Sequence, residues 1–412
     1  MAERNNTRPS PDRQTRGRID YSKNSRQKRG NQRSDDGGRL SSTIIKLLVV
    51  LVLLLLVVSL WRNRIDLSCA NLTQCADDTF AMCGTGKGFP STINGSHAAS
   101  IDSIADGGIV LLSDTSLTIY DDTAREAAVR AHFMSSPAMK VAGRYAVTFD
   151  MGSTDFRVDA AADTIAAGDA ERPLVSCAVS RDCCYALVMQ GSSKGESWLS
   201  SVEVFDREGE SLHKWHCADW YLTDAALSAD GAYLALAGVN ASGGELVSAI
   251  IIHKVGSMDQ VAEYVLSDNI CLSLEYNNDG TLFAIGSNAL TVVTDSGKQR
   301  EDIKYTGTLA AYDVCYDGGA VVCTADELGT TANVYDARGR ERCTYRVSSA
   351  VQNVSLSDEA CAVIGDGILT AIRLDGTLIT QVEANATTGG LLLIDRTAYT
   401  VDGMRVSSLE LK

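Results

Sequence analysis

The 412-residue sequence lacks several of the short motifs that identify a catalytic or metal-binding site. It holds no C-x-x-C pair, which excludes a zinc ribbon and a thioredoxin-type redox site. It also holds no phosphate-binding loop, no H-E-x-x-H pair and no EF-hand loop. We therefore predict no metal ion, no cofactor and no enzymatic activity.

Three segments match a catalytic or metal-binding motif in part, but the residues around them do not fit the structure that the motif needs. Residues 191–195, GSSKG, fit G-x-S-x-G, but a further strand follows them where a nucleophile elbow needs a helix. Residues 211–214, SLHK, fit S-x-x-K, again without a helix. Residues 213–217, HKWHC, resemble a metal cluster, yet histidines three apart on a strand point to opposite faces. All three segments are interpreted as turns or strands.

Cysteine is absent from the first 68 residues, and acidic residues are scarce there. Residues 1–64 carry 14 basic and five acidic side chains, net +9; residues 65–412 carry 23 and 47, net −24, which together give −15. The acidic part is a poor ligand for nucleic acid. All 12 cysteines lie in it, which suits disulfides or buried free thiols. Pairing is most expected at Cys69, Cys75 and Cys83.

One apolar run organises the chain: residues 40–61, LSSTIIKLLVVLVLLLLVVSLW. About 20 residues at about 1.5 Å rise span a bilayer core of about 30 Å. Residues 1–43 hold 11 Lys and Arg, whereas only Arg62 and Arg64 follow closely. The positive-inside rule then predicts an uncleaved signal anchor in the plasma membrane, with a cytoplasmic N-terminus and an extracytoplasmic C-terminal domain. A cleaved signal peptide is the alternative, disfavoured by the long basic region.

The predicted domains follow from this span. Residues 1–39 are a disordered basic tail that touches anionic lipid headgroups, because they have almost no large apolar side chains. Residues 62–87 form a Cys-bearing linker. Residues 88–412 form one extracytoplasmic domain.

That domain repeats itself at a period of roughly 36 to 49 residues. Each unit has a short apolar segment, a tight turn, an apolar run such as 145–150 (YAVTFD), a second turn and an alternating strand. The first turn is plainest at Asp106-Gly107, Asp230-Gly231, Asp279-Gly280 and Asp317-Gly318. No long helix-period stretch follows residue 65. The pattern predicts an all-β fold, a β-propeller of eight blades, or seven if one weak unit is a loop.

The ends of the repeat predict how the ring closes. The last unit lacks a fourth strand, since the chain stops just after RVSSLEL (405–411). The strand-like GFPSTI (88–93) has no unit of its own. We expect these two segments to pair and so to complete the last blade.

The repeated turn and the order of segments along the chain also resemble those of known propeller families. The S-x-D-G-x-x-L-A pattern at 228–235, echoed at 277–284, resembles the blade turn of WD-repeat and quinoprotein-like propellers, although no Trp-Asp dipeptide occurs. The basic tail, span, Cys-bearing linker, GFPSTI and the stretch VAGRYAVTFDMGSTDFRVD (141–159) resemble an uncharacterised family of single-span membrane-anchored propellers of Gram-positive clostridial bacteria. The resemblance implies a fold and a location and brings no catalytic residues.

One aromatic cluster indicates a binding site. Three of the four tryptophans lie between 198 and 220. In a four-stranded blade the second-to-third loops and the blade linkers emerge on one face, so loops 191–199 and 239–245 and linker 213–221 should meet there. The predicted patch comprises Trp198, Trp215, Trp220, Tyr221, Lys194, Glu196 and Asn240. The alternative is that these rings pack between blades.

Two classes of function follow. The favoured one is a membrane-tethered, non-enzymatic binding or scaffold module for an envelope protein or glycan. The other is a quinoprotein- or hydrolase-type propeller enzyme whose site is assembled from scattered residues. Acids or histidines lining the central channel would favour the enzyme, and a bare channel with an aromatic rim would favour the binding module.

Overall fold

The chain divides into two compact units, Met1–Ile65 and Asp66–Lys412. The computed structural model describes residues 46–51, 69–191, 197–257, 259–384 and 388–412. In the first unit, residues 46–51 are helical. Within the described ranges no helix has both the length and the apolar character needed to cross a bilayer. The basic tail and most of the expected span, residues 40–61, lie outside these ranges, so both stay predictions.

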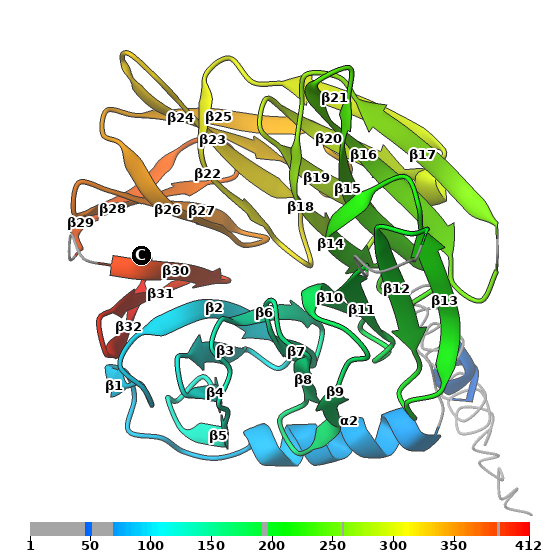
Figure 1. Cartoon of the computed structure of the whole chain (residues 1–412). Coiled ribbons are helices and arrows are strands. Elements are labelled where there is room, and N and C mark those ends of the chain that lie inside the picture. The colour runs from blue at the N-terminus through cyan, green and yellow to red at the C-terminus, as the bar shows by residue number, and fades with distance from the viewer. Residues whose placement is uncertain (1–45, 52–68, 192–196, 258, 385–387) are drawn as a thin grey trace, which may run out of the picture. The chain divides into compact units, whose positions relative to one another are not determined.

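The second unit is an eight-bladed β-propeller, which confirms the favoured blade count (Figure 1). Each blade is a four-stranded antiparallel sheet, and the first strands of successive blades lie next to one another at the centre. Blades 1 to 4 comprise β2 (Ala98–Ile104), β3 (Gly108–Ser113), β4 (Ser116–Tyr120) and β5 (Glu126–Ala131); β6 (Pro137–Ala142), β7 (Tyr145–Asp150), β8 (Asp155–Asp159) and β9 (Thr164–Asp169); β10 (Leu174–Val179), β11 (Tyr185–Gln190), β12 (Ser200–Phe205) and β13 (Ser211–Cys217); and β14 (Tyr221–Leu227), β15 (Tyr233–Ser242), β16 (Glu245–Lys254) and β17 (Gln260–Leu266).

Blades 5 to 8 continue the same order. They comprise β18 (Cys271–Tyr276), β19 (Leu282–Gly286), β20 (Ala289–Thr294) and β21 (Gln299–Lys304); β22 (Thr308–Val314), β23 (Ala320–Asp326), β24 (Gly329–Tyr335) and β25 (Glu341–Val347); β26 (Val351–Leu356), β27 (Ala360–Gly365), β28 (Ile368–Arg373) and β29 (Leu378–Glu383); and β30 (Thr388–Ile394), β31 (Thr397–Asp402), β32 (Arg405–Glu410) and β1 (Ser91–Thr92). A short 3-10 turn, η1 (Asp295–Gly297), joins β20 to β21.

The Asp-Gly pairs form tight turns between the first two strands of their blades. Asp106 and Gly107 have φ of 65° and 72°, and Gly231 has φ of 63°. Glycine reaches this left-handed region without a steric penalty, and aspartate tolerates it better than most residues. The repeated turn therefore reverses the chain at the same point in each of these blades.

Blade 8 closes the ring as the two ends of the repeat predicted. Ser91 pairs with Val406, and Thr92 pairs with Arg405, in an antiparallel ladder between β1 and β32. The Ile93 N–H also donates to the Met404 carbonyl at 2.9 Å. One blade is thus built from both ends of the propeller, although β1 covers only the first two residues of β32.

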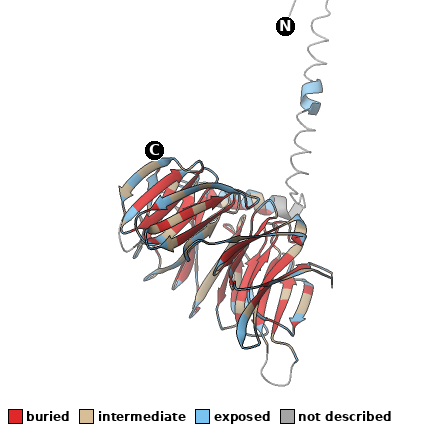
Figure 2. Ribbon diagram, turned by 90° about the horizontal axis from the view of Figure 1, so that it is seen from above, coloured by how far each residue is buried: buried red, intermediate tan, exposed pale blue. Residues whose placement is uncertain are grey.

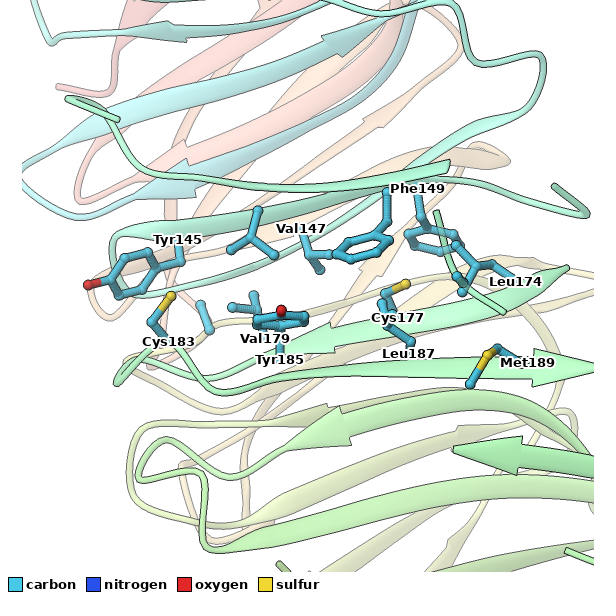
Figure 3. Close-up of a cluster of buried hydrophobic side chains, with 14 of the residues drawn as sticks. Tyr145, Val147, Phe149, Leu174, Cys177, Val179, Cys183, Tyr185, Leu187 and Met189 are labelled. Atoms are coloured by element: carbon cyan, nitrogen blue, oxygen red, sulfur yellow. The ribbon is translucent and has the colours of Figure 1, made fainter. Parts of the chain in front are cut away.

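The cores lie between adjacent blades. Figure 2 shows buried residues filling the middle of the sheets and exposed residues at their margins. In the joint between blades 2 and 3, side chains of β7 such as Val147 and Phe149 face Leu174, Cys177 and Leu187 of β10 and β11 (Figure 3). Because each sheet is covered on both sides, its inner strands read as continuous apolar runs rather than alternating ones.

A helix, α2 (Cys69–Met82), occupies part of the segment expected as a linker. Its buried polar side chains hold it on the propeller: the Arg207 guanidinium donates to Gln74 Oε1 at 2.7 Å, and the Ala162 N–H donates to Asp78 Oδ1 at 2.9 Å. Met82 enters the core of blade 1. The helix therefore crosses the turns of blades 1, 2 and 3 and joins them.

The eleven cysteines whose side chains are described are free thiols, Cys75 and Cys83 among them. Cys323 and Cys361 are fully buried core residues, as their apolar strand context indicated. Burial raises the pKa of the Cys323 thiol to about 12, so it is protonated and unreactive at neutral pH.

Candidate binding faces and central cavity

The propeller has two faces of different composition. We call the face with the second-to-third strand loops and the blade linkers the loop face, and the face with the other turns the turn face. The predicted meeting of three segments on the loop face is confirmed by two contacts. The Leu199 N–H donates to the Cys217 carbonyl at 2.7 Å, and Asn240 Nδ2 donates to the Asp219 carbonyl at 2.6 Å.

The predicted aromatic patch is partly at the surface. Tyr221 has 54% of its surface exposed. Trp198 is half-buried, with the Arg172 guanidinium 4.8 Å from its ring centroid and the His216 ring at 4.6 Å. Asn240 is half-buried beside them. Lys194 and Glu196 lie outside the described residues, so their place in the patch stays a prediction.

The other two tryptophans of the patch pack between blades. Trp220 is only 9% exposed; its ring covers Gly238, and its Nε1 donates to Glu263 Oε1 at 3.1 Å. Trp215 is half-buried and lies 4.4 Å from the ring of His253. A flat platform of three exposed tryptophan rings is therefore not formed, because burying an indole between sheets removes more apolar surface from water than exposing it at the rim.

The loop face carries most of the exposed apolar side chains of the propeller. Nine large ones lie in its loops or at the strand ends beside them: Phe133, Met151, Tyr221, Leu246, Val265, Leu272, Leu328, Ile368 and Met404. Phe133 is fully exposed and Leu328 is 79% exposed. Among the described residues the turn face carries fewer large exposed apolar side chains: Phe80 of α2 and, at strand ends, Leu212, Leu378 and Leu409.

The turn face is charged instead. Seven of its eight first-to-second strand turns carry an aspartate, and that of blade 2 carries Arg144: the acids are Asp106, Asp182, Asp230, Asp279, Asp317, Asp358 and Asp395. Helix α2 covers part of this face. A charged, partly covered face and an apolar, open face are thus set back to back.

A central cavity of about 530 Å³ opens between the first strands of the blades. It is lined by Asp102 of β2, Lys140 of β6, Glu275 of β18 and Asp313 of β22. The three acids occupy equivalent positions, each two residues after the point where pairing resumes beyond a bulge in its strand. The repeat therefore aims all three carboxylates at the axis.

The positive charge of Lys140 is balanced by the carboxylate of Asp224. Its Nζ lies 2.9 Å from Asp224 Oδ2 and 3.0 Å from the Leu274 carbonyl. Asp224 also accepts from Ser176 Oγ at 2.7 Å and from the Leu274 N–H at 2.8 Å. One carboxylate in blade 4 thereby joins blades 2, 3 and 5.

Of the remaining acids, Glu275 lies close enough to the Lys140 ammonium for that charge to lower its pKa against the effect of burial. Burial raises the pKa of Asp102 to about 8, and the charges of Glu275 and Asp313 add to the shift. Burial raises the pKa of Glu275 to about 6 and also raises that of Asp313. Asp102 therefore carries its proton at neutral pH, whereas Glu275 is mostly ionised.

Sequence reasoning did not single out the cavity residues. A signal was present, because Asp102, Glu275 and Asp313 are each the one charged residue of a first strand. Only the ring places them together. No group of three or more metal-ligating side chains occurs within the described ranges. His213 is buried and His216 is exposed, as the strand alternation predicted.

The chain matches one family model and resembles several solved structures. Residues 91–408 match the model of a family of unknown function (DUF5711). The C-terminal WD40 domain of Sif2 is 11% identical, with a TM-score of 0.54 over 80% of this chain and 100% of that one. AztD from Citrobacter koseri in its apo form is 10% identical, with a TM-score of 0.50 over 75% and 90%. BamB from Moraxella catarrhalis is 12% identical, with a TM-score of 0.49 over 78% and 100%. No curated protein sequence matches.

Proposed function

Since this chain belongs to a family of unknown function (DUF5711), we propose from its own geometry that it is a membrane-tethered, non-enzymatic binding module that docks a partner protein on the loop face. The single observation that carries the proposal is the concentration of exposed apolar side chains on that face. Monomeric soluble domains rarely expose large contiguous apolar surface unless it binds something.

The charges of the loop face indicate the kind of partner. Its exposed acids include Glu171, Asp219, Asp268, Glu327 and Asp366. Its basic residues are fewer: Arg172 lies over the Trp198 ring, and Lys304, Arg346 and Arg405 lie at strand ends of this face. Anionic lipid would be repelled by such a rim. A protein surface with an apolar centre and basic margins is complementary to it.

The longest hairpin of the propeller supports docking at blade 4. Strands β15 and β16 have ten residues each, and their ladder runs out to Ser242 and Glu245. Leu246, 61% exposed, lies near the tip of this hairpin, and Tyr221 lies at the start of β14 in the same blade. Residues on a protruding, regularly paired hairpin are presented rigidly, so that little side-chain and loop entropy is lost on binding.

We expect the double substitution Tyr221→Ser and Leu246→Ser to lower capture of the partner at least tenfold and to leave the melting temperature unchanged. Aromatic and large apolar hot-spot side chains contribute about 1 to 4 kcal/mol each to an interface. The measurement is cross-linking of the full-length protein in intact cells, followed by quantitative mass spectrometry of co-purified proteins.

A matched control is available on the opposite side. Leu212 and Leu378 are 40% and 47% exposed at the turn-face ends of outer strands. Leu212→Ser with Leu378→Ser removes comparable apolar surface and should leave capture intact. Equal loss in both double variants, or no loss in either, would contradict docking on the loop face.

The central cavity favours a second candidate, a hydrolase-type enzyme. A protonated Asp102 could act as a general acid and an ionised Glu275 as a general base. Activity would then rise as pH passes about 6, where Glu275 loses its proton, and fall as pH passes about 8, where Asp102 loses its own. The acids that line the cavity are the feature that favours this candidate, because a bare channel would favour the binding module.

Activity assays separate the two candidates. The binding module predicts no turnover when the full-length protein in detergent is incubated with cell-envelope glycans and peptides between pH 5 and 9. Turnover with a maximum between about pH 6 and 8, abolished by Asp102→Asn or Glu275→Gln, would establish the enzyme and refute the proposal.

A further inference from the structure

Two buried histidines face each other across the joint between blades 3 and 4. His213 lies on β13, the outer strand of blade 3, and His253 lies on β16 of blade 4. Their ring centroids are 5.8 Å apart, and their exposed fractions are 6% and 2%. Neither residue belongs to the loop face or to the central cavity.

Three of the four ring nitrogens of this pair are buried without hydrogen-bond partners among the described residues. Within the described residues, both nitrogens of His253 and Nε2 of His213 have no hydrogen-bond partner. His132, at the joint of blades 1 and 2, is buried as well but is satisfied: its Nε2 lies 3.1 Å from the Ser113 carbonyl, and its Nδ1 accepts from the Met134 N–H at 3.3 Å. The unsatisfied nitrogens therefore distinguish the joint of blades 3 and 4.

The strands around the pair offer no compensating negative charge. On β12, Val204 pairs with His213; on β15 and β17, Leu234 and Gln260 pair with His253; and on β13 the Trp215 ring lies 4.4 Å from His253. The apolar cluster of this joint includes Val204 and Leu234.

The charged side chains of these strands are engaged elsewhere. Lys214 Nζ lies 3.0 Å from the exposed Glu171 carboxylate and 2.9 Å from that of Glu203, whose side chain is 13% exposed. Glu263 of β17 accepts from Trp220 and from Gln260. Lys254, next to His253, is exposed. A proton taken up by either imidazole would thus be an unpaired charge in an apolar joint, next to a second basic ring.

We propose that the His213–His253 pair is a pH-sensitive joint, at which acid separates blade 3 from blade 4 before the rest of the ring opens. Neutral imidazoles are tolerated there at modest cost, whereas imidazolium is not. Opening lets water solvate the charged rings, so protons and joint opening favour each other.

The direction of the effect follows from the protonation of the two states. Burial lowers the pKa of His253 to about 4, with the His213 ring adding to the shift, and burial lowers that of His213 as well. In the unfolded or opened state the two histidines have an ordinary pKa of about 6.5. Below that pH this state therefore holds more protons than the closed state. The contribution of the neutral pair to the stability of the closed joint is complete above about pH 6.5. This contribution is lost as pH falls through about 4.

Hydrogen exchange with mass spectrometry on the full-length protein in detergent tests the proposal. Between pH 7.5 and 4.5, protection factors in β13 and β16 should fall first, by up to about tenfold per pH unit for each proton taken up. Protection in β2–β3 and β26–β27 should hold over the same range. Opening that begins at β1 and β32, or uniformly in all blades, would overturn it.

Variants make the test specific to the pair. His213→Leu with His253→Leu places apolar side chains in an apolar joint and should reduce the local pH dependence to that of the other blades. His253→Phe alone covers the case in which the double variant packs poorly, and it should remove the larger part of the effect. Unchanged pH dependence at β13 and β16 in either folded variant would also overturn the proposal.

Discussion

Replacing Asp224 by alanine is expected to destabilise the propeller by about 3 to 5 kcal/mol, the range for removing one partner of a buried ion pair. The substitution leaves the Lys140 ammonium without its anion, and it leaves the Leu274 N–H and Ser176 hydroxyl without an acceptor. Three blades lose their tie to blade 4 at once. A typical domain has about 5 to 15 kcal/mol of stability, so this is a large fraction.

Denaturant unfolding of the full-length protein measures the loss as a lower midpoint. Asp219→Ala, at an exposed acid of the loop face, is the matched control and should change stability by less than about 0.5 kcal/mol. A double variant, Lys140→Met with Asp224→Leu, should recover much of the loss, because no unpaired charge remains in it. Equal effects of Asp224→Ala and Asp219→Ala would mean that the network does not hold the blades.

Deleting residues 404–412 is expected to abolish cooperative folding or to leave an aggregating product. The deletion removes β32, which lies between β31 and β1, and with it the fully buried Val406 and the nearly buried Leu411. Burial of two aliphatic side chains contributes about 3 to 6 kcal/mol. The exposed edge of β31 is also a template for pairing with other chains.

Size-exclusion chromatography and thermal melting report the outcome of this deletion. Glu410→Ala with Lys412→Ala changes exposed side chains of the same segment and should leave both readouts unchanged. A truncated protein that stays monomeric with an unchanged melting temperature would show that blade 8 does not need its third strand.

Local patterns in the sequence were enough to predict the propeller architecture. The Asp-Gly turns, the runs of four to eight apolar residues and their period predicted eight four-stranded units, because turn chemistry and strand length are encoded within a few neighbouring residues. The unpaired segments at 88–93 and 405–411 predicted the closure found between β1 and β32. The family match to residues 91–408 concerns this same repeated part.

Helix α2 was missed for a physical reason. Its propeller-facing side includes the polar Gln74 and Asp78, and Phe80 is 77% exposed, so its hydrophobic pattern does not show which side is buried. The helix is held by hydrogen bonds from Arg207 and Ala162, which belong to turns far away in the sequence. Such partners cannot be inferred from helical periodicity.

The sequence by itself therefore determined the repeat, the closing strand and the face on which each loop emerges, and it favoured eight blades over seven, since these depend on contacts between neighbouring strands. Only the tertiary structure decided which side chains meet. It buried Trp220 against Gly238, aimed Asp102, Glu275 and Asp313 at one axis, and placed His213 opposite His253. These groupings join residues from different blades, and their positions depend on the angle and register at which whole sheets pack around the ring, which no local pattern encodes.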